Sequence, residues 1–504
     1  MISFSILIFL FSLIVSNDGN PLSRSYIHNR MKIIEEENKM AFGSSIGLSP
    51  AEELANQCLM KAKFDEVDHG YLHPTEFLPA QNYLEVSKKI KNSVVYQMIR
   101  KMPKGGLFHA HISSMLPPEE LMKFTYEPNL YICKTKNLVY KFVFSKNPPG
   151  KKCDWKLLSA MRKRDPKIDA KIKKSLVLQR SKFEDLNVVW NDFEEIFDTV
   201  RGIITYRPVF EKYLRGVLEE VYKDNIMFVE IRSGASQLYE LDGRYLDTVK
   251  SVEVAFKIVK KFTNEHPDFL GMKMIYSPHR NPSPERLKEI VQTYMQLKAA
   301  FSDKIIGFDF VGQEDKLPSL YSVAHVLETF PADTQFFFHA GETNWYGHPS
   351  DLNLVDAVLF NTKRIGHGFA LPKHPKVMEI VKNKGIAIEI NPISNQVLKL
   401  VDDLRNHPAS EFFANNLPVV VSSDDPSYWD AKSLSSDFYE TFVGIMSRSA
   451  DLRSLKQLAL NSITYSGLDD QEKHAAKKIF KTKWKEYMDK LTQSKYCTEI
   501  NETS

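Results

Sequence analysis

The sequence contains little cysteine, and the four that it has are widely spaced. Cys58, Cys133, Cys153 and Cys497 form no CxxC pair in 504 residues. A zinc knuckle and a cysteine-ligated nucleobase site are therefore excluded. Of the three full pairings, the local candidate is Cys133 with Cys153, a disulfide that would close an insertion in an oxidising compartment. The sequence leaves open whether Cys58 and Cys497 pair.

Long apolar runs are also missing beyond the first fifteen residues, so we expect no membrane span. Those fifteen, MISFSILIFLFSLIV, carry no charge and have the length of a signal-peptide core. The usual basic residues before the core are absent, which leaves an N-terminal anchor or a buried helix as alternatives. We expect a signal peptide over residues 1–16 and a secreted protein. The only glycosylation sequon begins at Asn501, in the last four residues.

The chain has no strong overall charge, since its formal net charge is only +4. Residues 134–185, however, hold sixteen Lys and Arg against five Asp and Glu, a local charge of +11. Such asymmetry indicates either a surface for acidic partners, such as glycosaminoglycans or a cell-surface receptor, or a merely solvated face. Aromatic platforms for base stacking are not evident among these lysines, so no nucleic-acid partner is expected.

No internal repeat or low-complexity tract interrupts the chain. Residues 17–104 read as helical, with Ser49, Pro50 and Glu52 forming an N-terminal capping signal. From residue 105 onward, short apolar runs alternate with helical segments, which predicts an α/β fold with a parallel sheet buried on both faces. Eight such strands predict a closed (β/α)8 TIM barrel. The expected strands are 107–112, 226–232, 272–277, 305–311, 335–340, 364–368, 386–390 and 418–423.

The first connection in this barrel is unusually long, from about residue 113 to 207. We interpret its basic part, 120–186, as an insertion stapled by Cys133 and Cys153. The barrel with its C-terminal helices would then occupy 105–496, after an N-terminal helical segment over 17–104 and before a tail over 497–504.

Two histidines stand at the end of the first expected strand. In LFHAHI, alternate side chains share a face, so His109 and His111 point the same way. An HxH pair alone is weak evidence for a metal site. At the carboxyl end of a barrel strand it gains weight, because that end carries the active site in such barrels.

Further chemistry-bearing residues follow at later strand ends. His339 closes FFFHA, Glu342 follows three residues later, His367 lies between glycines, and Asp424 and Asp425 end PVVVSSDD. Each also has an ordinary structural interpretation when taken singly. His339 is then a core histidine and Glu342 a carboxylate at a helix N-terminus, whereas His367 is a turn histidine and Asp424 and Asp425 are turn aspartates. Together at successive strand ends, they predict three imidazoles and one carboxylate around a divalent metal, with a position open for water.

Several longer motifs resemble those of a known protein family. MPKGGLFHAH, FVGQED, HAGETNW, RIGHGFAL, NPISNQVLKL, LRNHP and SSDDP together resemble the secreted adenosine-deaminase-related growth factors, the extracellular type-2 adenosine deaminases. The resemblance extends over nearly the whole chain. It implies one zinc ion per chain, held by His109, His111, His339 and Asp424, and a homodimer formed through the N-terminal helices.

The resemblance also implies roles in converting adenosine, and 2′-deoxyadenosine, to the inosine product and ammonia. Glu342 would protonate purine N1, and His367 would orient the attacking water. Asp425 would hydrogen-bond to N7, the backbone N–H of Gly312 would meet N3, and Trp190 would line the pocket or serve as a buried structural aromatic.

One departure from the family pattern concerns the sugar. An acidic residue commonly follows the second metal histidine, whereas here Ile112 does, with Ser113 and Ser114 after it. Two other functions remain as alternatives: a growth-factor-like ligand that acts through the basic insertion with reduced catalysis, and an AMP or adenine deaminase.

Overall fold

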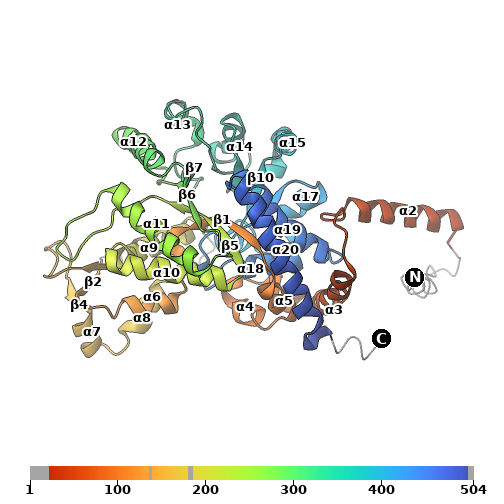
Figure 1. The fold of residues 1–504 in the computed structure, drawn as a ribbon, viewed down its shortest axis with the longest axis horizontal. Helices are drawn as coiled ribbons and strands as arrows, with labels where there is room; N and C mark the ends of the chain where they lie inside the picture. Colours follow the sequence, from red (N-terminus) through yellow and green to blue (C-terminus); the bar gives the residue numbers. More distant parts are fainter. Residues whose placement is uncertain (1–21, 136–138, 180–184, 498–504) are drawn as a thin grey trace.

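Two four-stranded parallel sheets form the centre of the computed structural model, which describes residues 22–135, 139–179 and 185–497 (Figure 1). Isolated parallel bridges from Phe308 to Phe336 and from Ala110 to Asp424 join the sheets at both edges, so the eight strands close into a barrel. The predicted (β/α)8 barrel is confirmed. Its strands are β1 (Gly105–His111), β5 (Ile226–Ser233), β6 (Met272–Tyr276), β7 (Ile305–Phe308), β8 (His339–Ala340), β9 (Arg364–His367), β10 (Ala387–Ile390) and β11 (Val419–Val421).

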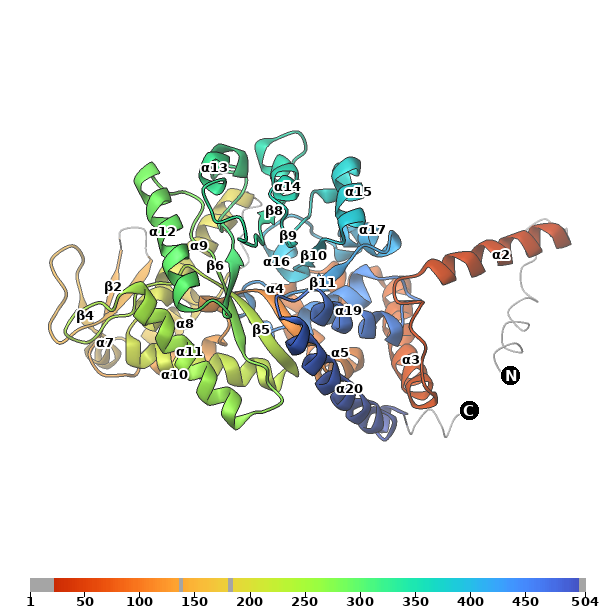
Figure 2. The same ribbon diagram turned by 45° about the horizontal axis from the view of Figure 1, so that its top comes forward.

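Each strand overlaps one of the eight expected ranges, because a parallel strand covered on both faces buries successive side chains. Every residue of β5, β7, β9, β10 and β11 is buried. Helices surround the strands (Figure 2). They are α10 (Arg207–Lys223), α11 (Thr248–Glu265), α12 (Pro284–Ala300), α13 (Leu320–Leu327), α14 (Pro349–Leu359), α15 (Pro375–Lys384), α16 (Pro392–Val397), α17 (Ala409–Ala414), α18 (Ser435–Tyr439) and α19 (Leu452–Thr464).

Helices from the N-terminal and C-terminal parts of the chain meet on one side of the barrel. Helix α3 (Pro50–Leu72) begins at the predicted capping box of Ser49 and Glu52 and packs against α20 (Asp470–Thr492). A disulfide between Cys58 of α3 and Cys497, after the end of α20, links the two parts and settles the pairing that the sequence left open. Two short helices, α4 (Tyr83–Ile90) and α5 (Val94–Lys101), lead into β1.

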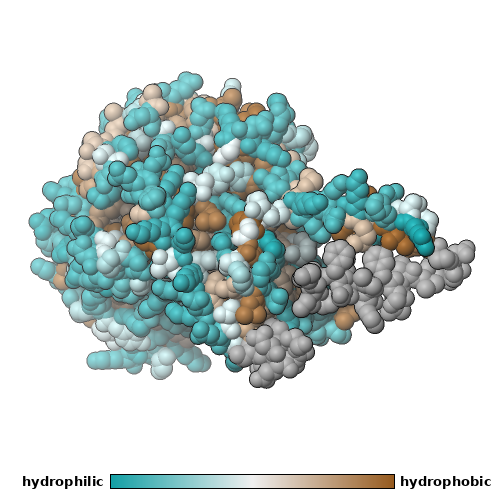
Figure 3. Space-filling view, turned by 45° about the vertical axis from the view of Figure 1, so that its right-hand side comes forward, coloured by the Kyte–Doolittle hydropathy of each residue, from teal (hydrophilic) through white to brown (hydrophobic). Residues whose placement is uncertain are grey.

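Helix α2 (Arg24–Met40) has no buried residue and projects from the body of the protein. In Figure 3 it shows hydrophobic side chains among hydrophilic ones. Tyr26, Ile33 and Met40 are each more than half exposed. No helix among the described residues is long and apolar enough to cross a membrane. The predicted signal peptide over 1–16 and the sequon at Asn501 lie outside the described residues.

The long connection after β1 folds into a small α/β unit. An antiparallel sheet has the order β3 (Tyr140–Phe144), β2 (Leu130–Lys134), β4 (Lys156–Leu157), and the predicted Cys133–Cys153 disulfide is confirmed. Around it lie α6 (Pro118–Phe124), α7 (Leu158–Arg164) and α8 (Ile168–Ser175). The following helix, α9 (Leu186–Ile204), packs against β3. The boundaries 120 and 186 for a separate insertion remain a prediction.

A buried carboxyl outside the barrel strands is expected to make the stability of the fold depend on pH. Glu440 opens the π-helical turn η8 (Glu440–Ile445) and is 1% exposed, and neither of its carboxyl oxygens has a hydrogen-bond partner among the described residues. Burial, and then the carboxyls of Asp437 and Glu66, raise the pKa of Glu440 well above its usual range. In the unfolded chain the same group ionises near its ordinary pKa of about 4.3.

We therefore expect Glu440→Gln to raise Tm at neutral pH. Between its unfolded and folded pKa values, native Glu440 keeps a proton that the unfolded chain releases, so wild-type stability falls by about 1.4 kcal/mol per pH unit in that window. A neutral glutamine removes this loss, and below the unfolded pKa the difference should vanish. Thermal melts from pH 4 to 8 test this, with Glu36→Gln on exposed α2 as the control. A difference in Tm that is constant across this range would contradict the assignment.

Candidate metal centre and active site

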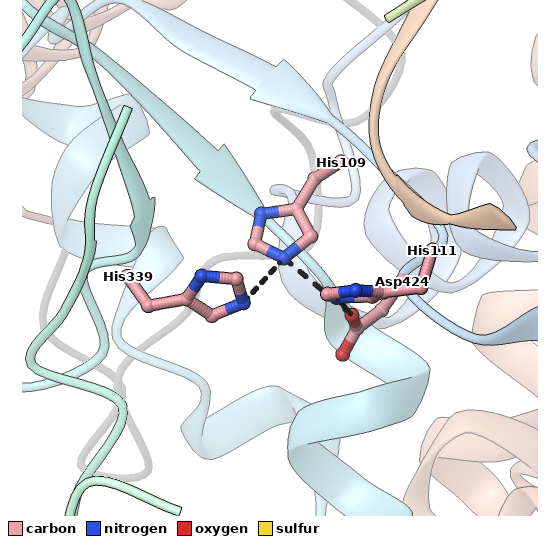
Figure 4. A group of neighbouring side chains, drawn as sticks. All are labelled: His109, His111, His339 and Asp424. Atoms are coloured by element: carbon pink, nitrogen blue, oxygen red, sulfur yellow. Dashed lines mark hydrogen bonds and ion pairs between the residues drawn. The ribbon is translucent and has the colours of Figure 1, made fainter. Parts of the chain in front are cut away.

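Four metal-ligand side chains meet at the carboxyl end of the barrel. His109 and His111 come from β1, His339 from β8, and Asp424 from the turn after β11. One ligand atom from each lies within 4.8 Å of all the others. His111 Nε2 is 3.1 Å from Asp424 Oδ1, and the Nε2 atoms of His109 and His339 are 2.9 Å apart (Figure 4). The structure thus brings together all four residues predicted to bind a metal.

Buried carboxylates fix the orientation of two of these rings. Nδ1 of His339 donates to Asp309 Oδ2 at 2.6 Å, and Nδ1 of His109 donates to Glu389 Oε2 at 2.9 Å. Carboxylates in this position set the tautomer of a metal-binding histidine and increase its basicity. Because Nδ1 is occupied, the Nε2 lone pair of each ring is directed toward the common centre.

The donor set fits a divalent metal such as zinc. Asp424 Oδ1 is buried and lacks a hydrogen-bond partner among the described residues, so it is a polar atom that a cation would satisfy. Asp424 also has a positive φ of 55°, a left-handed conformation that is uncommon for a residue other than glycine and concentrates at functional sites. Three imidazole nitrogens with one carboxylate oxygen form a common zinc-binding set.

Glu342 lies beside the metal centre and favours its protonated form. It is 5% exposed, and Oε1 is 3.5 Å from His367 Nδ1. Burial, and then the carboxyls of Asp424 and Glu314, raise its pKa well above the usual range. The backbone N–H of Glu342 donates to Glu314 Oε1 at 2.9 Å, which holds this loop in place. A carboxylic acid kept neutral at pH 7 is suited to donate a proton. Glu342, His367 and Asp424 also form a second group close enough to hold an ion.

His367 and Asp425 are the other two titratable side chains of the site. Burial lowers the pKa of His367 well below its usual range, so its imidazole is neutral, and Nδ1 is 3.0 Å from Asn395 Nδ2. Burial, and then the adjacent Asp424 carboxylate, raise the pKa of Asp425 well above its usual range. A neutral Asp425 carries a hydroxyl hydrogen that it can donate to a ligand.

Glu342, His367, Asp424 and Asp425 line one cavity of about 670 Å³. Its walls include Trp190, which is 5% exposed, and Gly312, so the structure places both predicted substrate contacts at this cavity. Gly312 has a φ of 114°, and a Cβ there would lie 2.8 Å from His279 Nε2. Only glycine fits this position without strain. Ile112 and Ser113 also line the cavity.

Comparison with known proteins decides the family. A family model described as "Adenosine deaminase" matches residues 157–482, and one described as "Adenosine/AMP deaminase N-terminal" matches residues 6–99. The chain belongs to the adenosine deaminase family. It is 40% identical over 493 residues to an adenosine deaminase 2 from Homo sapiens, covering 95% of this chain and 96% of that protein. An adenosine deaminase from Aedes albopictus is also 40% identical, with coverage of 94% and 90%.

Solved structures share the fold of this adenosine deaminase family member. An N6-methyl-AMP deaminase from Arabidopsis thaliana aligns with a TM-score of 0.54 at 16% identity, covering 77% of this chain and 98% of that chain. A zinc-bound amidohydrolase from Burkholderia ambifaria aligns with a TM-score of 0.54 at 18% identity, with coverage of 79% and 95%. At such low identity the likeness supports the barrel fold alone.

Sequence reasoning about this family member missed the charged residues that support the ligands. Arg232 donates to both Asp309 and Glu389 at 2.8 Å, and Arg364 donates to Glu389 Oε1 at 2.6 Å. Although burial opposes it, the two guanidinium groups and His109 hold the pKa of Glu389 well below its usual range. The available signal was charged residues within apolar strand segments, as in VEIRS, GFDF, RIGHG and AIEI.

Proposed function

We propose that this member of the adenosine deaminase family hydrolyses adenosine, and 2′-deoxyadenosine, to the inosine product and ammonia, with one zinc ion per chain. The observation that carries the proposal is the meeting of His109, His111, His339 and Asp424 within 4.8 Å, beside a carboxyl, Glu342, that favours its protonated form. This combination supplies a metal site and a proton donor in a single cavity.

The metal would be held by the three Nε2 atoms and Asp424 Oδ1. When bound, zinc lowers the pKa of water toward about 7 and so makes a nucleophile available at neutral pH. Asp309 and Glu389 keep the Nε2 atoms of two histidines turned inward, and Arg232 stabilises both carboxylates.

The side chains of the cavity then carry the protons. Neutral His367 accepts a proton as the water oxygen bonds to purine C6, while Glu342 gives its proton to N1. His367 passes its proton to the amino group, the C6–N bond breaks, and ammonia leaves. The C6 hydroxyl returns a proton to Glu342, which gives the keto form of inosine. Neutral Asp425 donates to N7, and the N–H of Gly312 donates to N3.

The test is turnover by the purified full-length protein supplied with zinc. We expect loss of the adenosine absorbance band with adenosine and with 2′-deoxyadenosine, and much lower activity with AMP and adenine. Faster turnover of AMP or adenine would reassign the substrate. Turnover of none of the four would favour the ligand hypothesis.

We also propose that the protein acts outside the cell as a homodimer. Two disulfides are typical of an oxidising compartment, in agreement with the signal peptide expected over 1–16. Most helices in proteins are stabilised by tertiary packing, and no residue of α2 is buried by the described part of the chain, so α2 favours a partner surface. A second copy of the chain is the partner that we propose for it.

A second candidate function is binding of polyanions, such as glycosaminoglycans or an acidic cell-surface receptor, through the insertion. Lys151, Lys152 and Lys174 are exposed there and make no ion pair within the described residues. We expect their replacement by Gln to lower the salt concentration at which the protein elutes from heparin, because fewer charges attract the polymer. Deamination should be nearly unchanged, since the insertion lies outside the barrel.

The matched control for this experiment replaces three dispersed exposed lysines, Lys101, Lys288 and Lys376. If both triple variants elute at the same salt concentration, the insertion is a solvated face and not a binding site.

A further inference from the structure

Glu314 is a buried acidic residue that has no direct part in the proposed reaction. It follows Gly312 in the motif FVGQED, in the turn after β7, and is 2% exposed. It is not one of the residues that line the substrate cavity. A buried carboxylate is costly unless it is paired and hydrogen-bonded, so the partners of Glu314 indicate what it does.

Four groups that bear N–H surround the two carboxylate oxygens of Glu314. The backbone N–H groups of Gly341 and Glu342 donate to Oε2 at 3.2 Å and to Oε1 at 2.9 Å. The side-chain amide of Asn353, on α14, donates to Oε2 at 2.5 Å, and Nη1 of Arg280 lies 3.6 Å from the same oxygen. A carboxylate suits all four because both of its oxygens accept, whereas a glutamine would turn an NH₂ group toward some of these donors.

Arg280, the cationic partner of Glu314, also bonds to the backbone of a metal ligand. It lies in the turn after β6 and is 2% exposed. Its Nη2 donates to the carbonyl oxygen of His339 at 3.2 Å and to that of Phe310 at 3.4 Å. Its own backbone N–H donates to the carbonyl oxygen of Val311 at 2.8 Å. The guanidinium group thus links the strand end that carries His339 to the turn that carries Glu314.

The segment between these contacts, residues 339–342, joins the metal centre to the proton donor. It begins at His339 and ends at Glu342. Gly341 within it has a φ of 74°, and a Cβ there would lie 2.8 Å from a side chain of α14, so only glycine fits. Glycine gives a backbone more freedom than other residues do, and contacts from outside the segment must restrict it. Arg280 holds the first carbonyl of the segment, and Glu314 holds its last two N–H groups.

We propose that Arg280 and Glu314 form a clamp that fixes the metal ligand His339 and the proton donor Glu342 relative to each other. Both are positioning residues, because neither lines the cavity. The inference rests on the proposed function, in which Glu342 gives its proton to purine N1. A displacement of about 1 Å in a reacting group can lower a rate by about 10²-fold. A buried ion pair contributes little to stability by itself, so its geometry is the reason for its presence here.

The first experiment measures kcat, KM and zinc affinity in Glu314→Gln. We expect kcat for adenosine to fall by about 10–100-fold with little change in KM, because Glu342 is displaced while the groups that bind the substrate stay in place. Zinc affinity, measured by competition with a chelator, should change little, because His339 keeps its contacts with Arg280 and Asp309. A wild-type kcat in the folded variant would overturn the inference.

A double-mutant cycle separates positioning from a general weakening of the fold. In protein that already carries Glu342→Gln, the further change Glu314→Gln should lower kcat by no more than about twofold, because the residue that it positions no longer acts. If Glu314→Gln lowers kcat by the same factor with and without Glu342, the clamp is a structural feature only and the inference fails.

Asp224→Asn is the matched control. Asp224 follows α10 and is a buried carboxylate that accepts from two backbone N–H groups, those of Leu434 and Ser435. Like Glu314, it also faces a buried cation, since Lys104 Nζ lies 3.7 Å from its Oδ1. It is not one of the residues that line the cavity. This variant should therefore lose stability in a similar way while its kcat stays unchanged.

Arg280→Lys tests the other end of the clamp without any turnover, and it serves as the second variant if Glu314→Gln does not fold. Lysine keeps the charge but lacks the fork of donors that reaches both His339 and Glu314. The affinity of the metal-free protein for zinc should fall about tenfold, as it does when an outer contact of a ligand is lost. If the wild-type protein deaminates no nucleoside, the proposed function fails and this measurement still tests the clamp. A zinc affinity equal to that of the wild type would overturn it.

Discussion

Replacing Glu342 by Gln is expected to lower kcat for adenosine by about 10²–10⁴-fold while leaving the zinc content unchanged. Glutamine keeps the size of the side chain but has no acidic proton for purine N1. The native carboxyl has that proton at neutral pH, because burial and the Asp424 and Glu314 carboxyls raise its pKa. Steady-state kinetics with metal analysis of the same sample measures both quantities.

Glu328→Gln, on the exposed surface after α13, controls for a change of charge elsewhere. Near-normal turnover by Glu342→Gln would remove Glu342 from proton transfer. Loss of zinc would instead identify Glu342 as a ligand, an outcome with a structural basis, since Glu342, His367 and Asp424 form a second group of potential ligand atoms.

His109→Ala is expected to lose both zinc and measurable turnover. His109 is the most central ligand: its Nε2 lies 2.9 Å from His339 Nε2 and 3.5 Å from Asp424 Oδ1, and its ring packs beneath Gly366. Its removal also leaves Glu389 Oε2 without an imidazole partner in a buried site. Metal analysis and the adenosine assay give the two readouts.

The control for this variant is His325→Ala, which removes an exposed histidine on α13. Both variants should unfold cooperatively, so that a loss of zinc reports on the site. A His109→Ala protein with full zinc content would show that the ion is held elsewhere.

The barrel was predictable because burial on both faces constrains the residues of each strand by itself, whatever its partners are. A parallel strand covered on both faces must be apolar along its length, and this run is visible in the sequence at each of the eight strands. The HxH pair was readable for the same reason, since alternation in one strand puts His109 and His111 on one face. Strand-end positions then gathered His339, His367 and Asp424 at the same end of the barrel.

The supporting residues were not predictable, because their partners lie far along the chain. Arg232 meets Asp309 and Glu389 across the barrel, and nothing local to any of the three indicates which charge neutralises which. The same holds for Cys58 and Cys497, which are 439 residues apart. Glu194 lies on α9 and His279 in the turn after β6, so only the closed barrel shows that they line the same cavity.

The central claim, zinc-dependent deamination of adenosine, is tested most directly by one reversible assay on the wild-type protein. The rate of conversion of adenosine to inosine is followed before chelation, after chelation and after zinc is returned. The structure predicts activity, its loss, and its recovery as zinc content approaches one ion per chain. Undiminished conversion in protein shown to be free of metal, or no conversion with the site filled, would contradict the assigned chemistry.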